Sequence, residues 1–151
     1  MRVLVASGPN LGRLGRREPH IYGTATLAEI HATLEARASG LGAAVECRQT
    51  NHEGELLDWI GAAENDGFHG VVLNPGGLTH TSVALLDAVR GSALPCVEVH
   101  LSNPDAREAF RRRSYVAAAC VGRIAGFGAR SYLLALEGLV AHVSSARSAA
   151  P

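Results

Sequence analysis

Residues 70–77, GVVLNPGG, determine how the rest of the chain is interpreted. Residues 70–74 carry apolar side chains on both faces, without the polar alternation of a half-exposed strand. A short apolar run of this kind is typical of a parallel strand that is covered on both sides. Pro75, Gly76 and Gly77 then turn the chain. The segment therefore predicts a central strand with a loop at its carboxyl end.

The same strand–loop–helix alternation extends in both directions from this segment. Thr26 and Glu29 form the sequence pattern of a capping box, which predicts a helix start, and Thr79 or Thr81 is expected to cap a later helix. Strands are expected at residues 2–6, 43–49, 70–74, 95–99 and 121–125, and helices at residues 27–38, 56–63, 83–89, 105–113 and 130–143.

Five strands that alternate with helices predict a single α/β domain. The expected architecture is a flavodoxin-like, doubly wound, five-stranded parallel sheet of order 2-1-3-4-5 with right-handed crossovers. We expect this catalytic domain to span residues 1–144 and the Ser/Ala-rich tail, residues 145–151, to fray.

Composition excludes several classes of function. The chain of 151 residues is 47% hydrophobic and 19% charged with a formal net charge of +0, which fits a soluble globular protein and gives no bulk preference for nucleic acid. No membrane span or signal peptide is predicted, so we expect a cytoplasmic protein. Cys47, Cys96 and Cys120 show neither disulfide nor zinc spacing and are interpreted as free thiols.

All 14 Lys+Arg residues are Arg. A lysine imine and a Walker-type phosphate lysine are therefore both excluded.

Residues 8–23, GPNLGRLGRREPHIYG, form a long loop without helix or strand periodicity. They contain four Gly, two Pro and three Arg and end near Tyr22. A small domain rarely keeps such a loop unless it acts as a lid or a binding segment. Arginines beside a tyrosine suggest an anion site with a phenol held near guanidinium groups.

Polar side chains collect where the predicted strands end, which is the ligand-binding edge of such a sheet. They follow the first strand (Asn10, Arg17, Tyr22), the third (Asn74, His80) and the fourth (Glu98, His100, Ser102, Asn103), and Arg107 and Arg111 are expected on one face of the next helix.

No nucleophile elbow, metal-ligand pair or GxGxxG motif follows a strand, so acid–base chemistry remains. A tyrosine is a weak base at its ordinary pKa of about 10, and neighbouring arginines favour its phenolate. A histidine is the obvious proton donor. The alternatives are that Tyr22 only caps the loop, that His80 only caps a helix and that Glu98 only orients His100.

Five segments together resemble the type II 3-dehydroquinate dehydratases (type II dehydroquinases): GPNLGRLGRREPHIYG, EGELLDWI, NPGGLTHTS, PCVEVHLSN and AREAFRRRSY. They occur in the family's order and cover residues 2 to about 142. The resemblance implies a flavodoxin-like subunit assembled as a dodecamer of four trimers, with no metal or organic cofactor. The implied reaction is anti elimination of water from 3-dehydroquinate to 3-dehydroshikimate through an enolate, without an imine.

The resemblance also assigns roles. Tyr22 is the implied base with Arg17 near it, Asn10 stabilises the enolate, and His100 is the acid, oriented by Glu98. The implied substrate contacts are Asn74, His80, Leu101, Ser102 and Arg111, with Arg107 supporting the tyrosine and Asp87 reaching the site of a neighbouring subunit.

The chain departs from the family pattern at Ser7, Leu86, Ala117, Ala118 and Arg123. Arg123 stands in a predicted strand where an apolar residue is expected. Two rival functions are a flavodoxin-like module that binds a flavin or phosphate without catalysis, and a structural subunit that has lost activity. The biosynthetic and quinate-degrading roles share one chemistry, so the sequence leaves both open.

Overall fold

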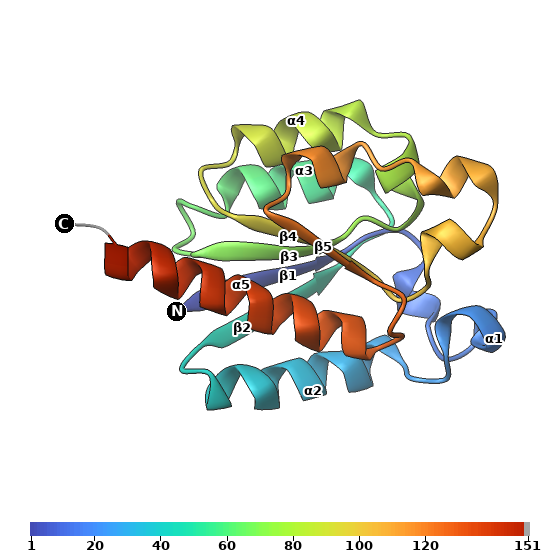
Figure 1. Ribbon diagram of the computed structural model, residues 1–151, viewed down its shortest axis with the longest axis horizontal. Helices are drawn as coiled ribbons and strands as arrows, with labels where there is room; N and C mark the ends of the chain where they lie inside the picture. Colours follow the sequence, from blue (N-terminus) through green and yellow to red (C-terminus); the bar gives the residue numbers. More distant parts are fainter. Residues whose placement is uncertain (150–151) are drawn as a thin grey trace.

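A five-stranded parallel sheet of order β2-β1-β3-β4-β5 lies at the centre of the protein (Figure 1). This computed structural model describes residues 1–149. The strands are β1 (Arg2–Ser7), β2 (Ala44–Gln49), β3 (Gly70–Asn74), β4 (Cys96–His100) and β5 (Gly122–Ala125), and every neighbouring pair is parallel. The predicted fold class and strand order are confirmed.

Helices cover both faces of the sheet (Figure 1). Helices α2 (Leu27–Gly40) and α5 (Arg130–Ala149) pack on one face, and α3 (Glu53–Ala62) and α4 (Val83–Gly91) pack on the other. Alternate side chains of β1 enter the two cores, with Val3 and Val5 on the α2/α5 side and Leu4 and Ala6 on the α3/α4 side. The sheet is therefore buried on both sides, as its apolar strands predicted.

Helix starts follow local side-chain chemistry. The capping box of α2 is present, because the Thr26 hydroxyl accepts from the backbone N–H of Glu29 and the Glu29 carboxylate accepts from that of Thr26. The predicted cap of α4 is wrong: Ser82, rather than Thr79 or Thr81, accepts from the N–H of Leu85. Thr79 instead lies within η2 (Gly76–His80), a short 3₁₀ turn that precedes the helix.

Two further predictions need correction. Residues 105–113 form no continuous helix but two 3₁₀ turns, η3 (Pro104–Ala106) and η4 (Ala109–Arg112), because Arg107 between them is extended. Helix α5 continues through residues 145–149, which were expected to fray, and the hydroxyls of Ser145 and Ser148 donate to carbonyls one turn earlier. The last two residues of the predicted tail, 150–151, lie outside the described part of the chain.

The loop at residues 8–23 contains two short turns, η1 (Leu11–Arg13) and α1 (Pro19–Tyr22), and it lies beyond the carboxyl ends of the strands (Figure 1). A further 3₁₀ turn, η5 (Val116–Ala119), precedes β5. Over residues 1–149, no helix combines the length and the apolar character that crossing a membrane requires.

Candidate active site

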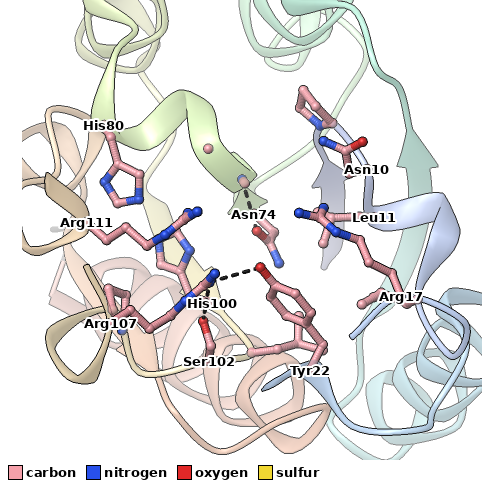
Figure 2. A pocket seen from close by; sticks show the side chains of 16 residues that line it. Asn10, Leu11, Arg17, Tyr22, Asn74, His80, His100, Ser102, Arg107 and Arg111 are labelled. Carbon is pink, nitrogen blue, oxygen red and sulfur yellow. Dashed lines mark hydrogen bonds between the residues drawn. The ribbon is translucent and has the colours of Figure 1, made fainter. Parts of the chain in front are cut away.

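A cavity of about 230 Å³ opens at the carboxyl edge of the sheet, where the loops after β1, β3 and β4 meet. Ten of the predicted site residues line it: Asn10, Arg17, Tyr22, Asn74, His80, His100, Leu101, Ser102, Arg107 and Arg111. In Figure 2, Asn10 and Arg17 lie on one side of the cavity, His80 and Arg111 lie on the other, and Asn74 lies between them. The fold thus brings together residues that are up to 101 positions apart, from Asn10 to Arg111.

The loop that carries Asn10 is held tightly against the turn after β3. The N–H of Gly8 donates to the carbonyl of Asn74 at 2.8 Å, and a Cβ on Gly8 would lie 3.0 Å from the carbonyl oxygen of Pro75. The backbone N–H of Asn10 donates to Oδ1 of Asn51 at 2.9 Å, with Asn10 in the left-handed region at φ 68°. These contacts fix where the Asn10 side chain enters the cavity.

Backbone strain is confined to the same loop. Asn10 and Glu18 are the non-glycine residues with positive φ in the described chain, and both lie within residues 8–23. Such conformations persist where the surrounding structure enforces them and cluster at binding and catalytic sites.

Two arginines lie against Tyr22. Nη1 of Arg107 donates to the Tyr22 hydroxyl at 2.9 Å, and the guanidinium carbons of Arg107 and Arg17 lie 5.3 and 5.4 Å from the ring centre. Arg17 also pairs with Glu18 at 3.2 Å. The guanidinium that is hydrogen-bonded to the phenol oxygen is therefore that of Arg107, whereas the Arg17 guanidinium lies near the ring.

A second tyrosine near the site is different. Tyr132 is fully buried in α5 and its hydroxyl lies 2.9 Å from the Ser7 hydroxyl. Burial, opposed by hydrogen bonds from Ser7 and Asn74, raises the pKa of Tyr132 to about 12. This phenol stays neutral at physiological pH, so Tyr132 is not a candidate base.

The candidate acid, His100, contacts a buried carboxylate. Nε2 of His100 contacts Oε1 of Glu98, whose side chain is fully buried beneath the floor of the cavity. The hydroxyls of Thr79 and Ser114 donate to the same carboxylate at 2.8 and 2.9 Å. Burial raises the pKa of Glu98, but His100 and the two hydroxyls outweigh it and hold that pKa below its ordinary 4.5. Glu98 is thus an ionised group that orients His100 and leaves Nδ1 of the imidazole toward the cavity.

His80 has its own orientation. Its Nδ1 lies 2.7 Å from the carbonyl of Arg113, which can only accept, so Nδ1 carries the hydrogen and Nε2 is an acceptor. Burial lowers the pKa of His80 further below neutrality, assisted by the charge of Arg111 and opposed by the bond to Arg113. A neutral imidazole with a free acceptor suits a ligand hydroxyl rather than a carboxylate.

Two predicted residues lie outside the cavity. Glu98 lies behind His100, as its orienting role requires, and Asp87 is exposed on α4, away from the cavity of its own chain. Sequence reasoning missed Thr79 and Ser114 as partners of Glu98. The segment AREAFRRRSY contains Ser114, but only the folded chain shows that its hydroxyl reaches back to β4.

Other chemistries find little support within residues 1–149. No group of three or more His, Cys, Asp or Glu side chains there is arranged to hold a metal ion. The three cysteines are free. Burial raises the pKa of Cys47 to about 12, and a hydrogen bond from Cys120, together with burial, raises the pKa of Cys96, so neither of these thiols is a ready nucleophile.

Comparison with known proteins shows the family of the chain. The family model described as "Dehydroquinase class II" matches residues 1–140, which is nearly the whole chain. The chain belongs to the class II dehydroquinase family. A 3-dehydroquinate dehydratase of Thermus thermophilus is 57% identical over 134 residues, covering 89% of this chain and 90% of that protein.

Solved type II dehydroquinases have the same fold. The enzyme from Butyrivibrio crossotus matches with a TM-score of 0.90 and 39% identity, covering 92% of this chain and 97% of that one. The enzyme from Propionibacterium acnes matches with a TM-score of 0.88 and 47% identity, covering 93% and 96%.

Most of the residues expected to depart from the family pattern lie away from the cavity. Leu86 is buried in α4, and Ala117 and Ala118 lie in η5. The Ser7 hydroxyl is hydrogen-bonded to the hydroxyl of the buried Tyr132. Arg123 differs from these, because its Nε lies 3.5 Å from Oε1 of Glu98.

The lowered pKa of Glu98 predicts an acid-dependent loss of stability in this dehydroquinase. A carboxyl whose folded pKa lies below its unfolded value stabilises the protein above the unfolded pKa, here 4.5, and loses that contribution as the pH falls through the folded pKa. We expect the difference in unfolding free energy between wild type and Glu98→Gln to shrink as the pH falls below 4.5, measured by denaturant titration. The exposed Glu64→Gln is the matched control. A pH-independent difference would show that Glu98 is not ionised in the fold.

Proposed function

We propose that the protein is a type II 3-dehydroquinate dehydratase that eliminates water from 3-dehydroquinate through an enolate. The observation that carries the proposal is the placing of a guanidinium-bonded tyrosine and a carboxylate-oriented histidine on one small cavity that three arginines line. Membership of the class II dehydroquinase family supports it.

Tyr22 is the proposed base. Its phenolate, stabilised by Arg107 and Arg17, removes the proton on C2, next to the ketone of the substrate. The electron pair of that C–H bond moves toward the carbonyl, and the oxygen becomes an enolate. Asn10, fixed by Asn51 at the rim of the cavity, stabilises this oxygen through a held water molecule.

His100 is the proposed acid. As the enolate collapses, the C1–oxygen bond breaks and the Nδ1 proton of the His100 imidazolium passes to the departing hydroxyl, which leaves as water. Tyr22 ends the step protonated and His100 ends it neutral. Transfer of one proton from the phenol to the imidazole, through solvent, restores the starting state, so no proton is gained or lost overall.

The remaining side chains bind the substrate. The Ser102 hydroxyl, 3.3 Å from Nη1 of Arg107, and the backbone N–H of Leu101 or Ser102 hold the carboxylate. Asn74, the acceptor nitrogen of His80, and Arg111 bind the ring hydroxyls. The mixture of one anion site and several hydroxyl partners fits a polyhydroxylated carboxylic acid.

An ultraviolet assay tests the function. Incubation with 3-dehydroquinate should produce the absorbance of a conjugated enone, and addition of borohydride should leave the rate unchanged, because a chain without lysine forms no imine with its substrate. Absence of the enone with a folded protein would favour a binding module or an inactive structural subunit and would overturn the proposal. Loss of activity on borohydride treatment would contradict the enolate route.

Arg17→Ala separates the charge effect from substrate binding. If the Arg17 guanidinium over the Tyr22 ring stabilises the phenolate, its removal moves the acidic limb of the kcat/KM profile to higher pH by about one unit. The exposed Arg16→Ala is the matched control, since Arg16 does not line the cavity. An acidic limb in the same place with a raised KM would make Arg17 a substrate contact only.

The proposal extends to assembly. Asp87 lies on the exposed side of α4, from which it can reach a neighbouring subunit but not its own cavity. We propose a dodecamer of four trimers in which Asp87 completes the site of an adjacent chain. Light scattering of the purified protein gives the subunit number, and Asp87→Ala is expected to raise KM without moving the pH limbs.

A further inference from the structure

A partly buried guanidinium, that of Arg123, lies beside the carboxylate that contacts the proposed acid. Arg123 is on β5, and its side chain is only 25% exposed. Its Nε and Nη2 are shielded from solvent and have no hydrogen-bond partner among the described residues. Leaving buried donors unpaired is unfavourable. Hydrogen bonding therefore does not account for the burial of these two nitrogens, and charge pairing with a nearby carboxylate does.

The sheet itself places Arg123 beside Glu98. In the parallel pairing of β4 with β5, Glu98 and Arg123 are register partners, so their side chains project from the same face of the sheet. Nε of Arg123 lies 3.5 Å from Oε1 of Glu98. Because two neighbouring strands fix this pair, it does not depend on the loops around the cavity.

Glu98 needs a cation that does not change charge. Its side chain is fully buried, and a buried carboxylate is costly unless it is paired. Within the described chain, two residues place a cationic nitrogen within 4.0 Å of Glu98: His100, which is charged only when protonated, and Arg123. The hydroxyls of Thr79 and Ser114 are neutral. When His100 gives up its proton, Arg123 is the remaining charged partner.

We propose that Arg123 is a positioning residue that keeps Glu98 ionised after His100 has lost its proton, and that it thereby makes that proton easier to transfer. The proposal rests on the proposed function, in which His100 is the acid. Arg123 neutralises part of the negative charge of Glu98, so the carboxylate attracts the His100 imidazolium less strongly than it would without Arg123. An arginine is suited to this role because it stays protonated throughout a reaction cycle.

Other titratable groups lie around the pair. His80 on η2 and Arg111 on η4 face His100 from the cavity, Cys96 lies at the start of β4, and Cys120 precedes β5. None of them brings a permanent positive charge within 4.0 Å of the Glu98 carboxylate.

Three variants test the role: Arg123→Gln, which removes the charge, Arg123→Lys, which keeps it, and Arg123→Val, which supplies the apolar side chain expected in this strand. In the full-length protein, R123Q and R123V should lower kcat about tenfold with KM within about twofold, and should move the basic limb of the kcat profile up by about one pH unit. R123K should restore the limb toward its wild-type position. Superimposable pH profiles for folded R123Q and wild type would overturn the proposal.

A measurement without turnover separates this proposal from the proposed function. In protein carrying ¹³C-labelled histidine, NMR should show the His100 ring losing its proton at higher pH in R123Q than in wild type, whether or not the enone forms. If R123Q does not fold, the comparison of R123K with R123V decides the same point. Unchanged titration of His100 across the folded variants would make Arg123 a purely structural residue and would contradict the inference.

Discussion

Replacing Tyr22 by Phe is expected to lower kcat by about 10³-fold while KM stays within about threefold of wild type. The substitution removes one oxygen atom, the one that accepts from Nη1 of Arg107 at 2.9 Å, and keeps the ring beside Arg17 and Arg107. Substrate contacts on the opposite wall of the cavity are untouched. Steady-state kinetics in the enone assay give both constants.

The matched control for this change is Tyr115→Phe. Tyr115 also lies against an arginine, with the Arg113 guanidinium 4.4 Å from its ring centre, but it does not line the cavity. We expect its kcat to match that of wild type. Retention of most activity by Tyr22→Phe would remove the phenolate mechanism, because no other tyrosine lines the cavity.

Replacing His100 by Asn is expected to lower kcat by 10²- to 10⁴-fold, roughly the contribution of a positioned acid. The change also leaves the ionised Glu98 with Arg123 as its charged partner, so the fold should survive while the basic limb of the pH–rate profile disappears. The loss of that limb distinguishes a missing acid from a merely distorted cavity.

His142→Asn is the control, since His142 is exposed on α5 and does not line the cavity. It should leave both limbs in place. A His100→Asn variant that keeps its basic limb would assign the proton to another group, and His80 would be the first to examine.

The sequence was sufficient for the architecture because the deciding signals are local. Apolar runs such as residues 70–74 must be buried on both faces, and the Thr26–Glu29 pair marks its helix start within four residues. The errors arose where local signals compete. Three hydroxyl residues within four positions, Thr79, Thr81 and Ser82, could each cap α4. The extended Arg107 divided a segment whose composition favours a helix.

The site could be predicted in outline for a different reason. The carboxyl ends of parallel strands lie at one edge of the sheet, so the residues that follow β1, β3 and β4 are close together there. Local patterns pointed only to Arg17, which is near Tyr22 in sequence, and the family resemblance alone assigned the supporting role to Arg107, which is 85 positions away. The pairing of Glu98 with Arg123 was equally hidden, because it depends on strand register.

The two reactive groups are attached to the molecule in different ways. His100 ends a central strand, whereas Tyr22 ends a short turn in a loop whose Arg13 and Arg16 are exposed. Trypsin acting on the native enzyme should therefore be able to cut within this loop. The nicked protein would keep its sheet, its melting temperature and the contacts of Glu98 with His100 and Arg123, yet it would lose turnover. Folding and catalysis would then fail independently in this chain.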